Sequence, residues 1–376
     1  MHVISFLEHL WLEHHQISIG GLQIFEAGKG YLFADKQFDK FKEWGVQIPY
    51  ERISKAEAMF RPLNYSENGP KGRVLIYNGV GGMGDQIMTW PLAKILADRG
   101  YEIHVLTEPH LVMFWHGFPW IRSTVSLPCY WSTLQQFDHH VMLEYISNGY
   151  AHDNQMQPID LMLQQCGIDP ASISDEEKRI APLFTKMEQD IASTLYQGRS
   201  LGFYQLACSQ QIRSLSPAHS RSVLRALAEA FPEIYWIGIY GPLEEPAYWG
   251  ESLDLPNVEF RSFERPRILW SLIQRAALCV APDSMLVHIA GALGRPCVGL
   301  WGPYGAATRT KYYSNHAAIH HTDACPLSPC HWNAIQVPHI CPPSPHPRER
   351  CEPMLRITPE EVVAAAKALL HSADRP

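Results

Sequence analysis

The sequence predicts an α/β protein with two doubly wound domains that face each other across a cleft. Strand-like and helix-like segments alternate in two series, one in each half of the chain. Such strand–helix–strand units favour parallel strands joined by right-handed crossovers. The length of 376 residues also exceeds what one hydrophobic core usually organises, so two domains are expected.

The first series begins with an apolar run at residues 74–77, typical of a buried strand. Further strands are expected at 102–106 and 141–143. Residues 86–99 predict a helix, which Gly100 ends. One face of that helix is apolar, with Ile87, Trp90, Ala93, Leu96 and Ala97.

The second series follows a charged, helical connection at 174–199. Near the end of the chain, Thr358, Pro359 and Glu361 form a capping-box pattern for a last helix that reaches Leu370. Strands are expected at 202–207, 235–239, 278–281 and 297–301, and helices at 217–231, at 265–275 and from Met285 to a stop at Gly294.

The expected domain boundaries follow these series. Residues 1–70 form an N-terminal extension with short, glycine-broken strands at 16–25 and 31–33. Residues 71–195 form the first doubly wound domain. The second domain covers 196–376 and includes a cysteine-rich loop at 320–355 and the C-terminal helix.

Composition narrows the possible partners. The net charge of -7 and the absence of a Lys/Arg run argue against nucleic acid. No segment reaches the ~18 apolar residues of a membrane span. The N-terminus does not read as a secretory signal, so a cytoplasmic location is expected. The nine cysteines are then expected to be thiols or metal ligands rather than disulfides.

A glycine-rich loop separates the first strand from its helix. Gly79, Gly81 and Gly84 match G-x-G-x-x-G, and Glu102 or Glu108 lies at a distance suited to a ribose. This pattern supports one hypothesis, an NAD(P)-dependent oxidoreductase. The alternative is a tight turn that requires positive φ angles.

Asp85 follows the last of these glycines and argues against a dinucleotide. A carboxylate at a helix N-terminus would repel a pyrophosphate bound to the same N–H groups. It is better suited to face a neutral hydroxyl. A plain helix cap is the competing interpretation.

Residues 281–303 are the most informative segment. They predict a strand end, a turn with Asp283 and Ser284, a short helix and a buried strand. A helix N-terminus presents unpaired N–H groups to an anion such as phosphate. Ser284 adds a hydroxyl, and His288 lies one turn further on the same face. A helix cap followed by a polar helix residue remains the alternative.

Taken together, these segments resemble the ADP-heptose:lipopolysaccharide heptosyltransferase-like glycosyltransferases. Residues 81–92 (GGMGDQIMTWPL) resemble the opening loop of that family. Residues 282–296 (PDSMLVHIAGALGRP) and 300–303 (LWGP) resemble its donor-binding segment. The resemblance covers about residues 72–370 and implies a GT-B fold: a Rossmann-like acceptor domain at 71–195 and a Rossmann-like nucleotide-sugar domain at 196–376.

The resemblance implies a role for each matching residue. Asp85 matches the catalytic base, and Gly82 and Gly84 belong to the acceptor-side loop. Arg213 stands where the family offers a basic residue to the donor phosphates. Two features depart from the family: Met285 replaces a usual glycine, and the extension at 1–70 is not typical. The diphosphate is expected at Ser284, the backbone of Met285 and Leu286, and His288.

The function implied is an inverting transfer of a heptose-like sugar from a nucleoside diphosphate to a hydroxyl of a glycan or protein. Asp85 would take the hydroxyl proton, while Arg213 and the helix N-terminus would stabilise the leaving diphosphate without a catalytic metal. An ADP-heptose-like donor and a possible homo-oligomer are the expected partners. A catalytically silent GT-B-like assembly module is a further alternative.

Four cysteines gather in the proline-rich loop at 320–355. Their pattern, C-x4-C-x10-C-x9-C, suggests a structural four-thiolate site for zinc or iron, with free thiols or disulfides as alternatives. His331, His339 and His346 are alternative ligands. The similarity to autotransporter heptosyltransferases, which carry a four-cysteine iron site, favours the metal. The expected ligands are Cys325, Cys330, Cys341 and Cys351, whereas Cys129, Cys166, Cys208, Cys279 and Cys297 are expected to be inert core residues.

Overall fold

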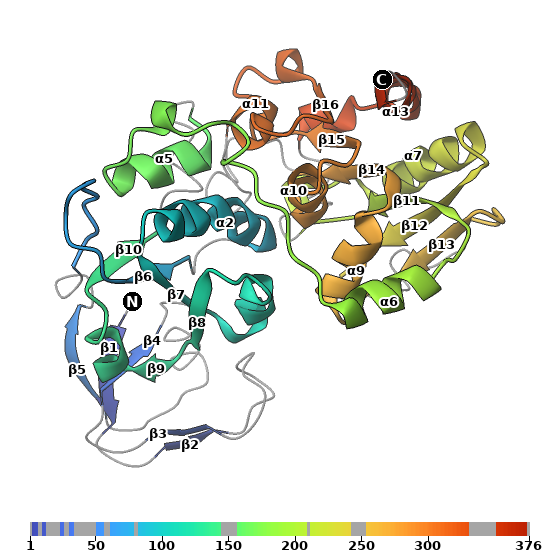
Figure 1. Ribbon diagram of the computed structural model, residues 1–376. Coiled ribbons are helices and arrows are strands. Elements are labelled where there is room, and N and C mark those ends of the chain that lie inside the picture. Colours follow the sequence, from blue (N-terminus) through green and yellow to red (C-terminus); the bar gives the residue numbers. More distant parts are fainter. Residues whose placement is uncertain are drawn as a thin grey trace. The chain divides into compact units, whose positions relative to one another are not determined.

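The computed structural model divides into two compact units (Figure 1). The first unit comprises Met1–Gly81, Thr89–Tyr145 and Leu161–Ile173, and the second comprises Gly82–Met88, Ile146–Asp160 and Ser174–Pro376. The structure describes residues 61–78, 82–143, 156–208, 211–241, 253–330 and 351–373, together with the backbone of five short strands between residues 2 and 55.

The first unit contains a parallel sheet with the strand order β10-β6-β7-β8. The helix α2 (Met83–Asp98), whose residues up to Met88 are grouped with the second unit, follows β6 in the chain. It begins three residues earlier than expected, because the Asp85 carboxylate accepts a hydrogen bond from the Gly82 N–H and so caps the first turn. The strands are β6 (Arg73–Tyr77), β7 (Glu102–Thr107), β8 (Ile121–Ser126) and β10 (His139–Met142).

The strand β8 was not expected, since its sequence IRSTVS is too polar to read as a buried strand. It is half-buried at the edge of the sheet and pairs only with β7 among the described strands. A parallel edge strand needs no continuous apolar run, so sequence periodicity did not reveal it.

The N-terminal strands form an antiparallel sheet with the order β5-β1-β4-β9. It joins β1 (His2–Phe6), β4 (Gly30–Phe33) and β5 (Tyr50–Lys55) to β9 (Cys129–Tyr130). The strand β9 comes from the middle of the first unit, so the extension is connected to that unit by the β4–β9 pair. A separate pair consists of β2 (Leu10–Leu12) and β3 (Gln23–Phe25).

The second unit contains a parallel sheet with the order β13-β12-β11-β14-β15-β16. From β11 the chain moves outward to β13 on one side, and then returns to β14 and moves outward on the other side. The strand order therefore reverses between β11 and β14. Its strands are β11 (Ser200–Gln205), β12 (Ile234–Ile239), β13 (Val258–Arg261), β14 (Ala276–Pro282), β15 (Cys297–Trp301) and β16 (His316–His320).

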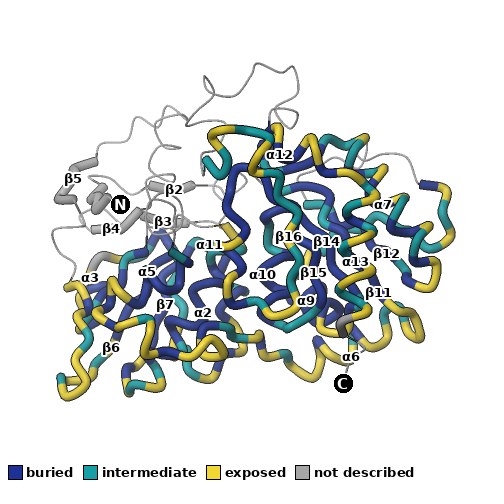
Figure 2. The backbone as a smooth tube through the Cα atoms, turned by 90° about the horizontal axis from the view of Figure 1, so that it is seen from above, coloured by how far each residue is buried: buried dark blue, intermediate teal, exposed yellow. Residues whose placement is uncertain are grey.

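Helices cover this sheet and its central strands are buried, as the dark blue strands in Figure 2 show. The predicted capping box is confirmed: the Thr358 N–H donates to Glu361, and the Glu361 N–H donates to the Thr358 hydroxyl. The helices are α6 (Lys186–Thr194), α7 (Pro217–Ala230), α9 (Pro266–Ile273), α10 (Met285–Ala292), α11 (Ala306–Thr310) and α13 (Pro359–Ala373).

The α/β fold class with two parallel sheets is thus confirmed. Two strands of the second sheet, β13 and β16, were not expected, because each is only four or five residues long and half-buried. Among the described residues, no helix is long and apolar enough to cross a membrane.

Candidate active site

The candidate site lies where the strand order of the second sheet reverses. Ligands of open α/β sheets bind beyond the carboxyl ends of the strands at such a switch point. The turn after β11 carries Arg213, and the turn after β14 carries Asp283 and Ser284. The segment after β15 leads into α11 with Arg309, and the first turn of α2 contributes Asp85.

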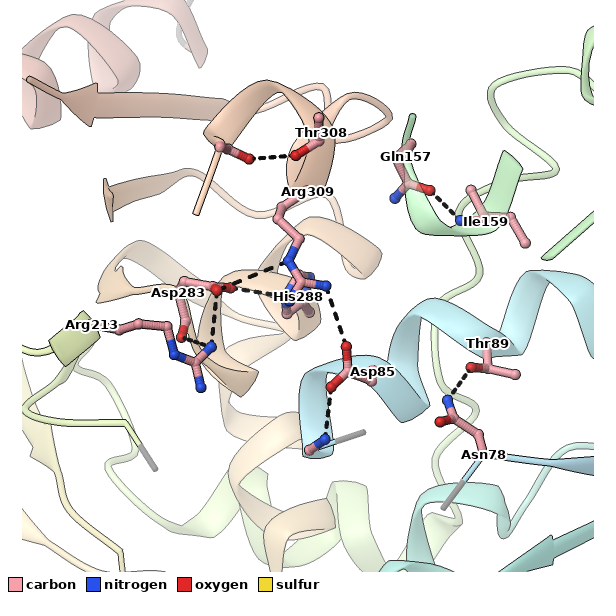
Figure 3. Close-up of polar contacts among 12 residues, drawn as sticks. Asn78, Asp85, Thr89, Gln157, Ile159, Arg213, Asp283, His288, Thr308 and Arg309 are labelled. Atoms are coloured by element: carbon pink, nitrogen blue, oxygen red, sulfur yellow. Dashed lines mark hydrogen bonds and ion pairs between the residues drawn. The ribbon is translucent and has the colours of Figure 1, made fainter. Parts of the chain in front are cut away.

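Asp283 is the centre of this group (Figure 3). Its side chain is buried, and Nη1 of Arg213 donates to its Oδ2 at 2.9 Å and to its backbone carbonyl at 3.0 Å. Nε of Arg309 lies 4.0 Å from Oδ2, and Nε2 of His288 lies 3.5 Å from Oδ1. Burial by itself would raise the pKa of Asp283, but Arg309, Arg213 and His288 hold it far below its usual value. Asp283 is therefore ionised.

Two aromatic side chains support these groups. The guanidinium carbon atoms of Arg213 and Arg309 lie 5.3 and 5.1 Å from the centre of the Tyr304 ring. The Tyr313 hydroxyl lies 3.0 Å from Nδ1 of His288. Burial raises the pKa of Tyr313 well above its usual value and keeps its hydroxyl protonated. A protonated hydroxyl can donate to Nδ1, which fixes the orientation of the His288 ring.

Gly84 makes room for His288. A β-carbon on Gly84 would lie 2.5 Å from Cδ2 of His288. That distance is too short for any real contact between carbon atoms. The glycine at this position is therefore required for the first turn of α2 to lie beside the histidine ring.

Asp85 has two contacts of different kinds. Its Oδ2 accepts a hydrogen bond from the Gly82 N–H at 2.7 Å, while Oδ1 lies 3.3 Å from Nη1 of Arg309 (Figure 3). The competing interpretation, a helix cap, therefore describes one oxygen correctly. The other oxygen faces the arginine of the charged group, so the two interpretations are compatible.

Ser284 precedes α10 but does not cap it. Its hydroxyl accepts no hydrogen bond from the helix, and its oxygen atom is buried with no hydrogen-bond partner among the described residues. Buried hydroxyl groups are normally satisfied, because an unmade hydrogen bond costs about 1–3 kcal/mol. An unsatisfied one beside a helix N-terminus is suited to bind an anion.

Met285 occupies the first position of α10 without disturbing it. Its Sδ accepts a hydrogen bond from Nε1 of Trp270 at 3.3 Å, so the thioether packs against α9. Leu286, the next residue, is fully buried, and its side chain belongs to the core. The departure from the family glycine is therefore accommodated by a neighbouring tryptophan.

The structure thus brings Arg213 and His288 together around the Asp283 carboxylate, and Arg309 lies between that carboxylate and Asp85. Sequence reasoning missed the organising role of Asp283 and did not consider Arg309. A carboxylate within the apolar run 276–290 is an unusual burial and could have drawn attention to Asp283. The candidate cofactor residues Gly79 and Gly81 lie outside the described residues.

Some of the predicted cysteine ligands lie within the described residues and others lie outside them. Cys166, Cys279 and Cys297 are buried as expected, whereas Cys129 and Cys208 are only half-buried. Cys341 and the candidate ligands His331, His339 and His346 lie outside the described residues. Within the part of the chain that is described, no group of three or more His, Cys, Asp or Glu residues is arranged to hold a metal ion. Of the predicted ligands that are described, Cys325 and Cys330 are half-buried and Cys351 is buried.

A family model matches the part of the chain that holds several of these residues. Residues 268–333, which include Asp283, Ser284 and Arg309, match the model of glycosyltransferase family 9 (heptosyltransferase). A sequence search of curated proteins found no match.

Solved structures of that family share the fold. The ADP-heptose lipopolysaccharide heptosyltransferase II of E. coli is 14% identical, with a TM-score of 0.56 over 80% of this chain and 99% of its own. A family 9 glycosyltransferase of Veillonella parvula is 13% identical, with a TM-score of 0.58 over 83% and 99%. The dodecameric, iron-containing heptosyltransferase TibC of enterotoxigenic E. coli, in complex with ADP-D-β-D-heptose, is 12% identical, with a TM-score of 0.55 over 98% and 91%.

These matches support neither an NAD(P)-dependent oxidoreductase nor a silent assembly module. They confirm the resemblance drawn from the two sequence motifs and the GT-B fold that it implied. Residues 268–333 match glycosyltransferase family 9 (heptosyltransferase) and the chain has the fold of the heptosyltransferase structures, which together indicate a glycosyltransferase of GT-B fold.

Proposed function

We propose that the protein moves a heptose-like sugar from an ADP-heptose-like donor to an acceptor hydroxyl, with inversion at the anomeric carbon. The observation that carries this proposal is the unsatisfied, buried Ser284 hydroxyl at the start of α10. It lies next in sequence to Asp283, on which Arg213 and Arg309 converge. Donor groups of this kind suit a diphosphate.

The proposed chemistry is a single displacement. Asp85 accepts the proton of the acceptor hydroxyl as its oxygen attacks the anomeric carbon, and the bond to the nucleoside diphosphate breaks. The leaving diphosphate gains negative charge, which Arg213, Ser284 and the N–H groups of Met285 and Leu286 stabilise. These positive and polar groups take the place of a catalytic metal.

We also propose a donor and an acceptor for this reaction. The ADP-heptose complex of TibC supports the same class of donor here. A hydroxyl of a glycan or a protein is the proposed acceptor. The match to TibC covers 98% of this chain and thus includes most of the N-terminal extension, which supports a homo-oligomer as a further proposal.

The donor proposal is tested by thermal unfolding in the presence of ligands. We expect ADP to raise the unfolding temperature, because a ligand that binds only the folded state stabilises it by RT ln(1 + [L]/Kd). NAD should have little effect. The double variant Ser284→Ala, His288→Ala should lose the response to ADP. A protein that responds to NAD and to no nucleoside diphosphate would overturn the proposal.

We further propose a structural iron or zinc ion held by Cys325, Cys330, Cys341 and Cys351. Two described contacts support this. The hydroxyl of Ser328, between the first two cysteines, donates to the Gly302 carbonyl at 3.2 Å. A β-carbon on Gly302 would lie 2.9 Å from Sγ of Cys351. Segments distant in sequence thus meet at Gly302, and four thiolates suit either metal.

Elemental analysis of protein purified without added metal tests the cysteine site. We expect one iron or zinc per chain, and metal loss in Cys351→Ser but not in Cys166→Ser, a buried cysteine remote in sequence. The expected cytoplasmic location belongs to this proposal, because thiols stay reduced there. Metal-free protein with four freely titrating thiols and normal stability would contradict it.

A further inference from the structure

Arg309 contacts both the proposed base and the carboxylate at the centre of the donor group. From this arrangement we infer that Asp85 and the donor diphosphate compete for the Arg309 guanidinium, so that donor binding releases the base. This inference rests on the proposed function. It adds a positioning residue and an order of events to the transfer.

The positive and negative side chains of this site balance one another in number. Four charged groups share the buried site: Arg213 and Arg309 are positive, and Asp283 and Asp85 are negative. Burying a charge without a partner is costly, so each arginine needs a share of negative charge. Asp283 already accepts from Arg213 at 2.9 Å, whereas its distance to Nε of Arg309 is 4.0 Å. Asp283 and Asp85 therefore share the compensation of Arg309, and Asp85 supplies part of the negative charge that this arginine requires.

The polar contacts of Arg309 are long and involve few atoms. Arg309 approaches Asp85 at 3.3 Å through one nitrogen. By contrast, Arg267 in the same unit donates to both oxygens of Glu188, at 2.6 and 3.0 Å, and to the Leu183 carbonyl. The Arg267 pair is bidentate and strong. The one-nitrogen contact between Arg309 and Asp85 can be exchanged for a contact with a phosphate oxygen at a smaller cost.

Asp85 keeps a hydrogen bond of its own when Arg309 turns away. The Gly82 N–H donates to Oδ2 of Asp85 at 2.7 Å, independently of Arg309. The Tyr304 ring, 5.1 Å from the Arg309 guanidinium, continues to support the arginine. Once Arg309 is drawn to the diphosphate, Oδ1 of Asp85 loses its positive partner and is available to accept the hydrogen bond of an acceptor hydroxyl.

A double-mutant cycle measured by ADP-binding calorimetry tests this competition. Asp85→Asn removes the charge that holds Arg309, so ADP affinity should rise by about tenfold. Arg309→Gln should weaken ADP binding. In the Arg309→Gln background, Asp85→Asn should change the affinity by less than about twofold, because nothing remains to be released. Arg309→Lys should restore part of the gain.

The controls separate competition from other causes. Simple repulsion between Asp85 and ADP would give an equal gain with and without Arg309, and that result would overturn the inference. So would the absence of any gain in Asp85→Asn. Arg267→Gln, which breaks a structural pair, should lower stability and leave the effect of Asp85→Asn unchanged. If the Arg309→Gln variant does not fold, the Asp85→Asn measurement in the Arg309→Lys background decides between competition and repulsion.

The same measurements distinguish a failure of the proposed donor site from a failure of the inference about Arg309. If ADP does not bind the unmodified protein at all, the donor proposal fails. If ADP binds and the Ser284 and His288 changes abolish binding, but the cycle shows no coupling, only the inference about Arg309 fails.

Discussion

Two groups of charges in the second unit, each centred on a buried carboxylate, differ in how completely their hydrogen bonds are satisfied. The donor group consists of Asp283, Arg213, Arg309, His288 and Asp85, with polar distances from 2.9 to 4.0 Å. The linker group consists of Asp160, Lys178, Lys311 and Tyr312. In it the Tyr312 hydroxyl donates to Asp160 at 2.6 Å, and the two lysines lie 2.9 and 3.2 Å from that carboxylate.

The linker group is closed upon itself. Lys178 also donates to the Tyr312 hydroxyl at 2.9 Å, so the buried polar groups satisfy one another. Burial tends to raise the pKa of Asp160, but Tyr312 and Lys178 lower it overall. The donor group, in contrast, adjoins the unsatisfied Ser284 hydroxyl. A charge group whose members satisfy one another stabilises the fold, whereas a group with an unsatisfied donor beside it is available to a ligand.

The largest expected effect concerns catalysis by the donor group. Asp85→Asn keeps the shape of the side chain but removes its ability to accept a proton, so the turnover rate should fall by about 10²–10⁴-fold. Nucleoside diphosphate binding should not weaken. Steady-state kinetics with the identified donor and acceptor measure this. Near-normal turnover would leave Asp85 with the role of a helix cap.

The linker group should respond through stability instead. Asp160→Asn leaves the buried Lys178 without its counter-charge and should lower the free energy of unfolding by about 3–5 kcal/mol. ADP affinity should not change. Lys311→Ala is the matched control: that lysine side chain is 56% exposed, and its loss should cost less than about 1 kcal/mol. Urea unfolding measures both. Comparable losses in the two variants would refute the closed-group interpretation.

A third prediction concerns His316, whose pKa is lowered from 6.5 to about 4, chiefly by burial and further by the neighbouring His288. The unfolded chain takes up a proton at this histidine below pH 6.5, whereas the folded chain does so only near pH 4. The free energy of unfolding should therefore fall as the pH drops from 6.5 to 4, by at most ~3 kcal/mol from this group.

The variant His316→Gln should show a weaker loss of stability over the same pH interval. The exposed His116 provides the control, since His116→Gln should keep the full pH dependence. Urea midpoints measured at several pH values give the comparison. If the stability of His316→Gln and of the unmodified protein depended on pH in the same way, His316 would be protonated equally in the folded and unfolded states.

The smallest expected effect distinguishes two serines. Ser284→Ala should weaken ADP binding by about 5–30-fold, equivalent to about 1–2 kcal/mol, without loss of stability, because its hydroxyl is unsatisfied in the free protein. Ser220 has a buried hydroxyl that bonds the Tyr204 hydroxyl at 3.0 Å. Ser220→Ala should lower stability and leave ADP affinity unchanged. The reverse pattern would indicate that Ser284 is structural.

Much of the fold could be predicted because its signals are local. The apolar runs at 74–77 and 297–301 became the central strands β6 and β15, and the capping box at Thr358 formed as expected. The half-buried edge strands β8 and β16 gave no comparable signal. They form strands because a neighbouring strand pairs with them, and their own residues do not indicate that neighbour.

The sequence by itself determined the fold class, the helix start at Ser284 and the family motifs around it, since these depend on periodicity and on residues a few positions apart. Only the tertiary structure decided which charges meet. Arg309 and Asp85 are 224 positions apart, and Arg213 and Asp283 are 70 apart. Such contacts arise from the order of the strands and the helix that follows each one. A charged side chain looks the same in a sequence whether it is solvated, closed in an ion pair or left open for a ligand.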